Sequence, residues 1–302
     1  MSVAGAIRAA AADIKLHHSV FAMPFALLGA CLAAVQHEGL PWASMAGPLA
    51  LIVGCMIFAR TVAMLANRIL DASIDARNPR TAGRAIPSGR LSRRAALAMV
   101  SASVLAFEAC VLAFEVLYDN PWPLMLHVPI LLWLSLYPVT KRFTWLCHAW
   151  LGVSLAVSVP AAALALRPES LEQPAIWWLA GMVMLWVTGF DVIYALQDVE
   201  ADRREGLHSM PARLGVPASL WISRTMHAGA VVCLWQAWIA EPRLGPPFAF
   251  AIGLVTVVLV LEHATVRRWG TSRMALTFFT LNGIVSIVLG TAGMLGLAGV
   301  GR

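Results

Sequence analysis

The stretch NRILDASID, residues 67–75, closes an apolar run that is long enough to cross a membrane. Asn67, Asp71 and Asp75 follow one another at intervals of four residues, a spacing that places three oxygen-bearing side chains on one face of a helix. Two carboxylates so placed repel each other, and a hard divalent cation removes that repulsion because carboxylate oxygens are its preferred ligands. The stretch therefore predicts a membrane-spanning helix that ends in a cation-binding face.

The composition agrees with a chain that is solvated by lipid. Apolar residues make up 60% of the 302 residues, charged residues make up 13%, and the mean hydropathy is +0.75. Soluble domains contain about 25% charged residues. A soluble protein of this length has too little interior to hide so much apolar surface, so we expect an integral membrane protein.

Hydropathy predicts an all-α membrane protein with nine transmembrane helices. Each span needs about 20 apolar residues. The first run stays in the mature chain, because the N-terminal residues lack the features of a cleaved signal peptide. The predicted spans are 16–36, 46–70, 95–117, 122–138, 145–166, 175–197, 215–240, 247–266 and 275–299.

Basic residues fix the predicted orientation. The loops after the second, fourth, sixth and eighth spans are rich in Arg and Lys, whereas the opposite loops carry only Arg167 and Arg243. Cytoplasmic loops are the ones enriched in these residues, so we expect a cytoplasmic N-terminus. The net charge of +6 is then a topology signal, and we expect no nucleic-acid partner.

A second polar segment, DVIYALQDVEAD at 191–202, ends the sixth span as the first segment ends the second. Asp198 and Asp202 repeat the four-residue interval, Tyr194 takes the place of the Asn, and Asp191 lies seven residues before Asp198. We expect one domain over 1–302 made of two pseudo-repeated halves, 1–142 and 143–302, with a site between them.

The acidic segments have a simpler explanation as helix caps or as partners of basic loops. Two copies at matched membrane depth, each followed by Arg, favour a shared functional site instead. Mg²⁺ is usually bound through one or two carboxylates together with substrate phosphates, and Arg and Lys neutralise the remaining phosphate oxygens. Such a site at the end of an apolar bundle suits an amphiphile with a diphosphate head and a hydrocarbon tail.

Three segments resemble the UbiA superfamily of intramembrane prenyltransferases. NRILDASIDARNPRTAGRAIPSG (67–89) is similar to its NxxxDxxxD signature, DVIYALQDVEADRREGLHSMPARLG (191–215) to its DxxxD motif, and SLYPVTKRFT (135–144) to its YxxxK loop. Within the superfamily, IKLHHSVFAMPFALLGA (14–30) and the second motif look most like 4-hydroxybenzoate polyprenyltransferases and the related menaquinone enzymes of the futalosine route.

The resemblance implies Mg²⁺-dependent transfer of a polyprenyl group from a polyprenyl diphosphate to an aromatic acid, in ubiquinone or menaquinone biosynthesis. It also implies a multi-pass protein of the bacterial inner membrane, with a cytoplasm-facing site and no obligate protein partner. By the same resemblance, Asn67, Asp71 and Asp75 hold one Mg²⁺, Asp198 and Asp202 hold a second, and Asp191 lies in or beside the site. The implied diphosphate-binding residues are Lys15, Arg77, Arg84, Lys141 and Arg204.

The reaction needs a dry, cation-stabilising environment at the allylic carbon. Tyr137 and Tyr194 lie inside motifs, and their ring faces are candidates to stabilise a carbocation. Arg60 lies mid-span, where a charge is costly, on the face of Asn67 and Asp71. It either pairs with an acid such as Asp191, binds the carboxylate of an aromatic substrate, or does neither.

Three other functions share some of these sequence features. A CDP-alcohol phosphotransferase expects a DGxxAR arrangement that Asp71 and Asp75 lack. A secondary transporter is compatible with intramembrane acids, but transporters place their site at mid-membrane rather than at one surface. A UbiA-type enzyme with another acceptor, such as haem, chlorophyll or a lipid-type substrate, has the same diphosphate site.

Overall fold

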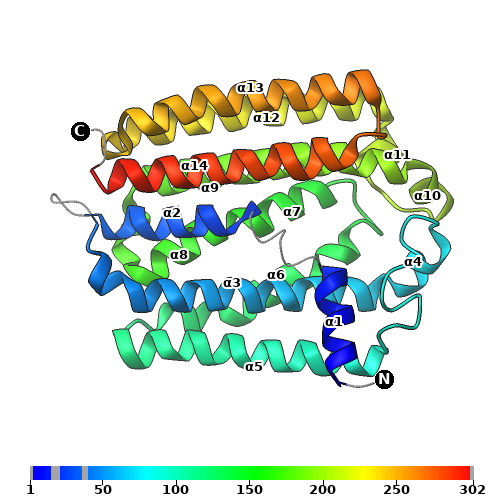
Figure 1. The fold of residues 1–302 in the computed structure, drawn as a ribbon, viewed down its shortest axis with the longest axis horizontal. Coiled ribbons are helices and arrows are strands. Elements are labelled where there is room, and N and C mark those ends of the chain that lie inside the picture. Colours follow the sequence, from blue (N-terminus) through cyan, green and yellow to red (C-terminus); the bar gives the residue numbers. More distant parts are fainter. Residues whose placement is uncertain (1–2, 15–20, 36–39, 300–302) are drawn as a thin grey trace.

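The structure, a computed structural model, describes residues 3–14, 21–35 and 40–299, and within these ranges its regular secondary structure is entirely helical. Long helices run side by side, and the short helices Ala72–Arg77, Val199–Arg204 and Met210–Leu214 gather at one end of the bundle (Figure 1). In chain order the helices are α1 (Val3–Ile14), α2 (Met23–Ala34), α3 (Trp42–Leu70), α4 (Ala72–Arg77), α5 (Arg93–Tyr118), α6 (Trp122–Thr140), α7 (Cys147–Ala156), α8 (Ser158–Leu166), η2 (Pro168–Glu172), α9 (Pro174–Ala195), η3 (Leu196–Asp198), α10 (Val199–Arg204), α11 (Met210–Leu214), α12 (Val216–Ala240), η4 (Pro242–Leu244), α13 (Gly245–Trp269), η5 (Ala275–Leu281) and α14 (Asn282–Leu297).

Seven helical segments in the described ranges are long and apolar enough to cross a membrane, and they coincide with seven of the nine predicted spans. The predicted span 16–36 lies partly outside the described residues, and its described helix α2 has 12 residues. The predicted span 215–240 is α12, a 25-residue helix whose interior includes Arg224 and His227. The multi-pass character is confirmed, whereas the number nine and the cytoplasmic N-terminus stay predictions.

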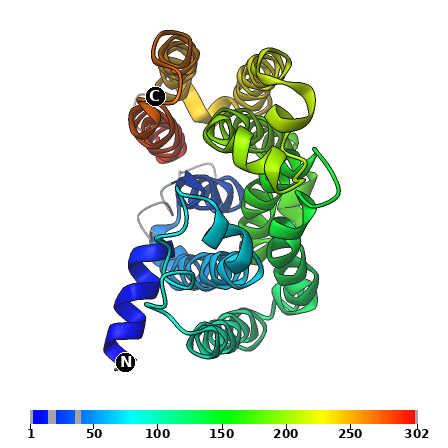
Figure 2. The same ribbon diagram turned by 90° about the vertical axis from the view of Figure 1, so that its right-hand side faces the viewer.

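The bundle is one continuous assembly of packed helices. Seen from the end in Figure 2, α9 lies between α12 and the helices of the N-terminal part. The largest core cluster surrounds α9, where the Trp186 side chain packs against Phe25 of α2 and Phe190. Helix α2 approaches α8 so closely that a Cβ at Gly29 would lie 2.6 Å from the Val159 carbonyl oxygen. The contacts of Trp186 with Phe25 and of Gly29 with Val159 join the predicted halves 1–142 and 143–302.

Both acidic segments interrupt a spanning helix. Helix α3 ends at Leu70, Asp71 takes non-helical dihedral angles, and α4 restarts for six residues. Helix α9 ends at Ala195, η3 closes on Asp198, and α10 restarts for six residues. The prediction of one unbroken helical face was therefore wrong, although the backbone N–H groups of Asp71 and Asp75 still bond four residues back. The breaks let the chain turn across the end of the bundle.

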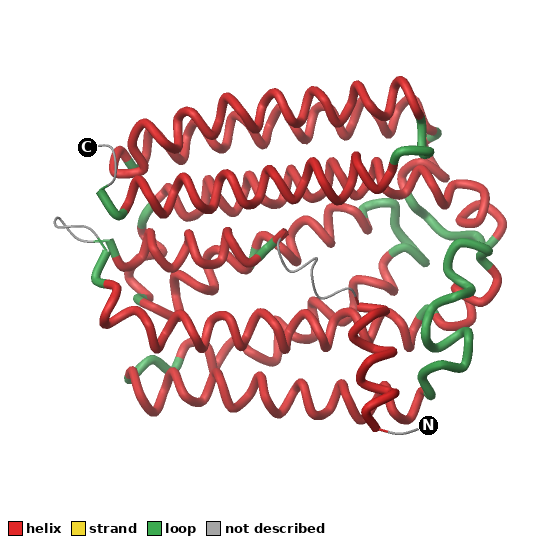
Figure 3. The backbone as a smooth tube through the Cα atoms, in the orientation of Figure 1, coloured by secondary structure: helices red, strands yellow, loops and turns green. Residues whose placement is uncertain are grey.

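The loops that join the short helices lie at the same end as both acidic segments, as Figure 3 shows. One of them, residues 78–92, contains the basic run after the first segment. The other, residues 205–209, follows the second segment. The fold thus brings two acidic segments and their basic loops, distant in sequence, to one end of the molecule.

Candidate functional site

Asp71 is the most deeply buried acid of the site, with 1% of its surface exposed. Its Oδ2 atom lies 2.5 Å from Nζ of Lys141, and its Oδ1 atom accepts a hydrogen bond of 3.2 Å from Arg142. Arg142 also donates to the Leu70 carbonyl oxygen at 2.7 Å, which satisfies one of the free carbonyls at the end of α3. The loop after α6 therefore supplies the two cations that compensate this buried charge.

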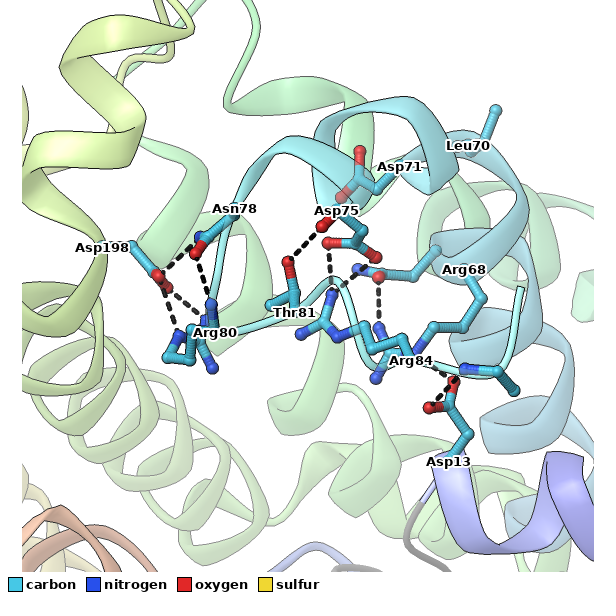
Figure 4. Close-up of polar contacts among 12 residues, drawn as sticks. Asp13, Arg68, Leu70, Asp71, Asp75, Asn78, Arg80, Thr81, Arg84 and Asp198 are labelled. Atoms are coloured by element: carbon cyan, nitrogen blue, oxygen red, sulfur yellow. Dashed lines mark hydrogen bonds and ion pairs between the residues drawn. The ribbon is translucent and has the colours of Figure 1, made fainter. Parts of the chain in front are cut away.

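Asp75 is buried to 4% exposure and is held by its own loop. Arg84 donates from one guanidinium nitrogen to both carboxylate oxygens, at 2.7 and 2.8 Å. The Thr81 hydroxyl donates to the Asp75 carbonyl oxygen at 3.0 Å. Figure 4 shows these side chains beside Asp71, so the basic loop folds back over the helix break that precedes it.

Asp198 joins the second acidic segment to the loop of the first. Arg80 donates from Nε to its Oδ1 atom at 2.8 Å and forms a second, shorter contact with Oδ2. The Asn78 amide donates to the same Oδ1 atom at 3.0 Å, and Arg80 also donates to the Tyr194 hydroxyl at 3.1 Å. Since these partners are more than 110 residues apart in the chain, the contacts directly join the two segments (Figure 4).

Asp202 is held by a serine hydroxyl, and Asp191 is held by a histidine. The Ser209 hydroxyl donates to Oδ2 of Asp202 at 2.5 Å. Oδ2 of Asp191 lies 2.7 Å from Nδ1 of His148. Lys141, which contacts Asp71, also acts electrostatically on Asp202, so its positive charge is felt by both acidic segments.

The remaining predicted diphosphate-binding residues lie at the periphery. Arg77 is exposed and donates to both carboxylate oxygens of Glu205, at 2.9 Å from its Nε atom. This bonding holds the pKa of Glu205 below its usual value. Arg204 is exposed, and Lys15 lies outside the described residues.

The first segment is also tied to the N-terminal helix. Arg68 donates to Oδ2 of Asp13 at 2.8 Å and to the side-chain oxygen of Asn67 at 2.8 Å. The backbone N–H of Ala85 donates to the other Asp13 oxygen at 3.1 Å. Through Arg68, the half-buried Asp13 of α1 fixes the orientation of the Asn67 amide.

Arg60 does not form the predicted pair with Asp191, whose carboxylate is engaged by His148. It donates instead to the Ile14 carbonyl oxygen at 3.4 Å and lines an internal cavity. That cavity has a volume of about 230 Å³ and lies between α2, α3 and α5 to α8. Asn67 and Tyr137 line it too, and its other walls are mostly apolar: Ile52, Ala59, Phe107, Phe114, Leu151 and Ala162. An apolar cavity thus begins at the first acidic segment and extends into the bundle.

The donor set fits Mg²⁺. Two carboxylates from each segment, with the Asn67 amide, offer the oxygen ligands that this hard cation prefers. In the part of the chain that the structure describes, no three acidic, His or Cys side chains converge into a closed metal cage. Since Mg²⁺ is generally bound by one or two carboxylates plus substrate phosphates, paired carboxylates flanked by Arg and Lys suit a metal–diphosphate complex.

Sequence reasoning missed several of these side chains as site residues. Arg80 and Arg142 carried a visible signal, since each lies beside a residue that was selected, Arg84 and Lys141 respectively. Asp13 and His148 carried none, because they reach the site from helices far along the chain; Ser209 follows Asp202 by seven residues, and its contact depends on the turn at Gly206. Of the two motif tyrosines, Tyr137 lies at the cavity wall and Tyr194 lies against Arg80, with 5.4 Å from the guanidinium carbon to the ring centroid.

Comparison with known proteins supplies a family. The model of the UbiA prenyltransferase family matches residues 22–299. The 4-hydroxybenzoate octaprenyltransferase of Alcanivorax borkumensis is 31% identical over 240 residues, which cover 76% of this chain and 78% of that protein.

Solved structures agree with this family. The apo structure of a UbiA homolog from Aeropyrum pernix K1 is similar with a TM-score of 0.80 and 31% identity, over 92% of this chain and 97% of that one. A UbiA homolog from Archaeoglobus fulgidus bound to GPP and Mg²⁺ has the same fold, with a TM-score of 0.70 and 14% identity over 96% of this chain and 99% of that one.

Proposed function

The chain belongs to the UbiA prenyltransferase family, and from that premise we propose that it transfers a polyprenyl group from a polyprenyl diphosphate to an aromatic acid such as 4-hydroxybenzoate. The relative from Alcanivorax borkumensis carries the name of that reaction at 31% identity, which supports the acceptor class. We place the reaction in ubiquinone or menaquinone biosynthesis. We also place the site at the cytoplasmic face of a bacterial inner membrane, because the basic loops share its end of the bundle.

One observation carries the proposal: two acidic segments, bridged by basic side chains, lie at one end of the bundle, and an apolar cavity lined by Asn67 of the first segment extends from there. A polyprenyl diphosphate has the matching chemistry, since its head carries several negative charges and its tail is hydrocarbon. Asn67, Asp71 and Asp75 would hold one Mg²⁺, and Asp198 and Asp202 a second. Bound there, Mg²⁺ would stabilise the negative charge that develops on the departing diphosphate.

The chain's own residues then bind the head group and keep water from the allylic carbon. Arg80, Arg84 and Lys141 already contact the acids, and each is placed to donate charge-assisted hydrogen bonds to phosphate oxygens. The apolar walls of the cavity exclude water, and the ring faces of Tyr137 and Tyr194 favour positive charge nearby.

The chemical step exchanges one bond for another. The allylic C–O bond breaks, a ring carbon of the acceptor forms the new C–C bond, and the ring loses its proton. That proton passes to the released diphosphate or to an Asp of the site. No protein nucleophile takes part.

Arg60 is the candidate for binding the acceptor carboxylate. It lines the cavity beside Asn67 and Tyr137, close to where the allylic carbon would lie. A guanidinium group pairs with a carboxylate through two parallel hydrogen bonds, and this pairing is strong in a partly dry cavity. An acceptor with a carboxylate would therefore be oriented by Arg60, and one without it would not.

The activity is tested with the protein in membrane vesicles, Mg²⁺, a labelled polyprenyl diphosphate and a panel of acceptors. Diphosphate release that requires both Mg²⁺ and 4-hydroxybenzoate is the expected result. Release that proceeds only with haem, chlorophyll or lipid-type acceptors would overturn the aromatic-acid assignment while leaving the family intact.

Arg60→Gln separates acceptor binding from the chemistry of the diphosphate. We expect its KM for 4-hydroxybenzoate to rise roughly 10-fold, since a hydrogen bond to a charged group contributes about 1.5–3 kcal/mol. The KM for a phenol that lacks the carboxylate should stay the same. Arg94→Gln is the matched control, because Arg94 is exposed at the start of α5. An unchanged KM for 4-hydroxybenzoate in Arg60→Gln would refute the role.

A further inference from the structure

Three consecutive residues between α10 and α11 each hold a different part of the candidate site. The His208 N–H donates to the Lys141 carbonyl oxygen at 2.7 Å, and the Ser209 hydroxyl donates to Asp202 at 2.5 Å. The Met210 N–H donates to Nε2 of His148 at 3.2 Å. Residues 208–210, which we call the brace, thus link the end of α6 and helix α7 to the second acidic segment.

A tight turn brings the brace back against the segment it follows. Gly206 has a φ of +67°, a left-handed conformation that favours glycine, and the next N–H, that of Leu207, donates to the Asp202 carbonyl oxygen at 2.8 Å. Ser209 and Met210 then enter the protein with only 4% and 3% of their surface exposed. The brace is therefore a packed part of the site rather than a surface loop.

The Ser209 hydroxyl does not do what serine usually does at this position. Ser209 precedes α11 with a φ of −59° and a ψ of 149°, and a serine before a helix ordinarily accepts a hydrogen bond from the first turn. Here its side chain makes no such bond and donates to Asp202 instead. The hydroxyl thus hydrogen-bonds to the Asp202 carboxylate, a Mg²⁺ ligand in the proposed function, instead of stabilising the first turn of α11 as a cap.

The Met210 contact fixes a second acid through His148. Nε2 of His148 accepts the Met210 N–H, so the proton of a neutral imidazole lies on Nδ1 and is donated to Asp191 at 2.7 Å. His148 is 4% exposed and Asp191 9% exposed, so this pair is shielded from bulk water. The brace thereby sets both the orientation and the tautomer of the His that holds Asp191.

We propose that Ser209 is a positioning residue for the metal–diphosphate site: its hydroxyl fixes the Asp202 carboxylate through Oδ2 and leaves Oδ1 to bind the metal. The inference rests on the proposed function, because Asp202 is a metal ligand only within it. Groups that hydrogen-bond to metal-binding carboxylates orient them, and their removal generally lowers metal affinity or activity by about 10–100-fold.

The test is direct metal binding by the purified full-length protein in detergent, with Mn²⁺ as the probe. Free Mn²⁺ is counted by electron paramagnetic resonance in the presence of a non-reactive prenyl diphosphate analogue and without any acceptor. We expect Ser209→Ala to weaken Mn²⁺ binding roughly 10-fold. Ser209→Thr keeps the hydroxyl and should bind as the unchanged protein does.

Ser219→Ala is the matched control, since Ser219 is equally buried but donates to the Gly215 carbonyl oxygen within its own helix. If Ser209→Ala does not fold, Ser209→Cys replaces it, because a thiol is of similar size and a weaker donor; reduced affinity is again expected. Mn²⁺ affinity within two-fold of the unchanged protein in the Ala or Cys variant overturns the proposal. So does a Thr variant that binds as weakly as the Ala variant.

The outcome is separable from that of the acceptor assay. If no aromatic acid is prenylated but Ser209→Ala still weakens Mn²⁺ binding, the acceptor assignment fails and the positioning role stands. If 4-hydroxybenzoate is prenylated and the Ala variant binds Mn²⁺ normally, the acceptor assignment stands and the positioning role of Ser209 fails. If the unchanged protein binds no Mn²⁺, both the metal site and the role of Ser209 are overturned.

Discussion

The two acidic segments share a spacing but not an environment. Asp71 and Asp75 are almost fully buried, and each is neutralised by basic side chains at 2.5–2.8 Å. Asp198 and Asp202 are only half-buried; Arg80 reaches Asp198 from the other segment's loop, and Asp202 is held by a serine hydroxyl. The acids of the first segment are thus buried beside cationic partners, whereas those of the second are half-buried and only Asp198 directly contacts a cationic side chain.

This difference indicates a division of labour between the segments. A buried carboxylate needs its counter-charges for stability, so the basic partners of Asp71 serve folding as well as binding. A half-buried carboxylate with a neutral partner keeps more of its negative charge available for a cation. We infer that the carboxylates of the first segment are held in fixed positions, whereas those of the second segment can move to fit a bound cation.

The largest effect is expected at Asp71. Asp71→Asn leaves Lys141 and Arg142 facing a neutral group, and breaking a buried ion pair costs about 3–5 kcal/mol; the lower end applies because Lys141 keeps some solvent contact. Turnover should fall roughly 10²–10³-fold or more. Asp202→Asn should lose comparable activity but only about 1 kcal/mol of stability, the net value of one hydrogen bond.

Thermal unfolding in detergent and diphosphate release measure the two quantities on the same samples. Asp119→Asn is the control, since Asp119 lies in the turn after α5, outside both segments. Equal destabilisation by Asp71→Asn and Asp202→Asn would contradict the proposed difference between the buried, charge-paired acids of the first segment and the half-buried acids of the second.

A smaller effect is expected at the arginine that crosses between the segments. Arg80→Gln removes two contacts to Asp198 and one to Tyr194, so the second segment should lose its register with the first. The Mg²⁺ concentration for half-maximal activity should rise roughly 10-fold. Arg84→Gln should instead mainly lower the unfolding temperature, because Arg84 neutralises a buried acid of its own segment.

A titration of activity against Mg²⁺ and an unfolding scan distinguish the two variants. Arg93→Gln is the control, since Arg93 is exposed in the first turn of α5. If Arg84→Gln raised the Mg²⁺ concentration for half-maximal activity more than Arg80→Gln did, the carboxylates of the first segment, not those of the second, would be the ones that move to fit the cation.

The sequence predicted what local pattern determines. Apolar runs revealed the seven spans, and the repeated four-residue interval revealed both acidic segments, because each depends on neighbours within a few turns. The helix breaks at Asp71 and Asp198 were missed, since an interval of four residues survives a single non-helical residue. The DxxxD spacing thus gave no sign of the helix breaks, and the shared site that it indicated stays a prediction.

Partners from distant parts of the chain lay beyond local pattern. His148 and Asp13 touch the site only because whole helices pack in one particular arrangement, and Ser209 reaches Asp202 because the chain turns back at Gly206. Arg60 shows the same limit: its mid-span position predicted an unusual role, but only packing showed that Asp191 already has another partner. A charged side chain such as Arg60 within a membrane span therefore indicates a functional region, but its position in the sequence does not identify the group that it contacts.

The smallest effect is expected at Glu205, a half-buried residue whose partner Arg77 is exposed at the edge of the contact between segments. Arg77 holds the pKa of Glu205 below its usual value, so the stability that this pair contributes is present above the unfolded-state pKa of about 4.3 and is lost only as pH falls through the lower folded-state pKa. Between pH 6 and 8 the unfolding temperature of Glu205→Gln should therefore differ from that of the unchanged protein by a small and constant amount. Because exposed ion pairs contribute little, any gain in prenyl diphosphate binding from the released Arg77 should lower its KM by about two-fold at most. A large, pH-dependent loss of stability over that range would mean that the second segment is anchored at this pair rather than at Arg80 and Ser209.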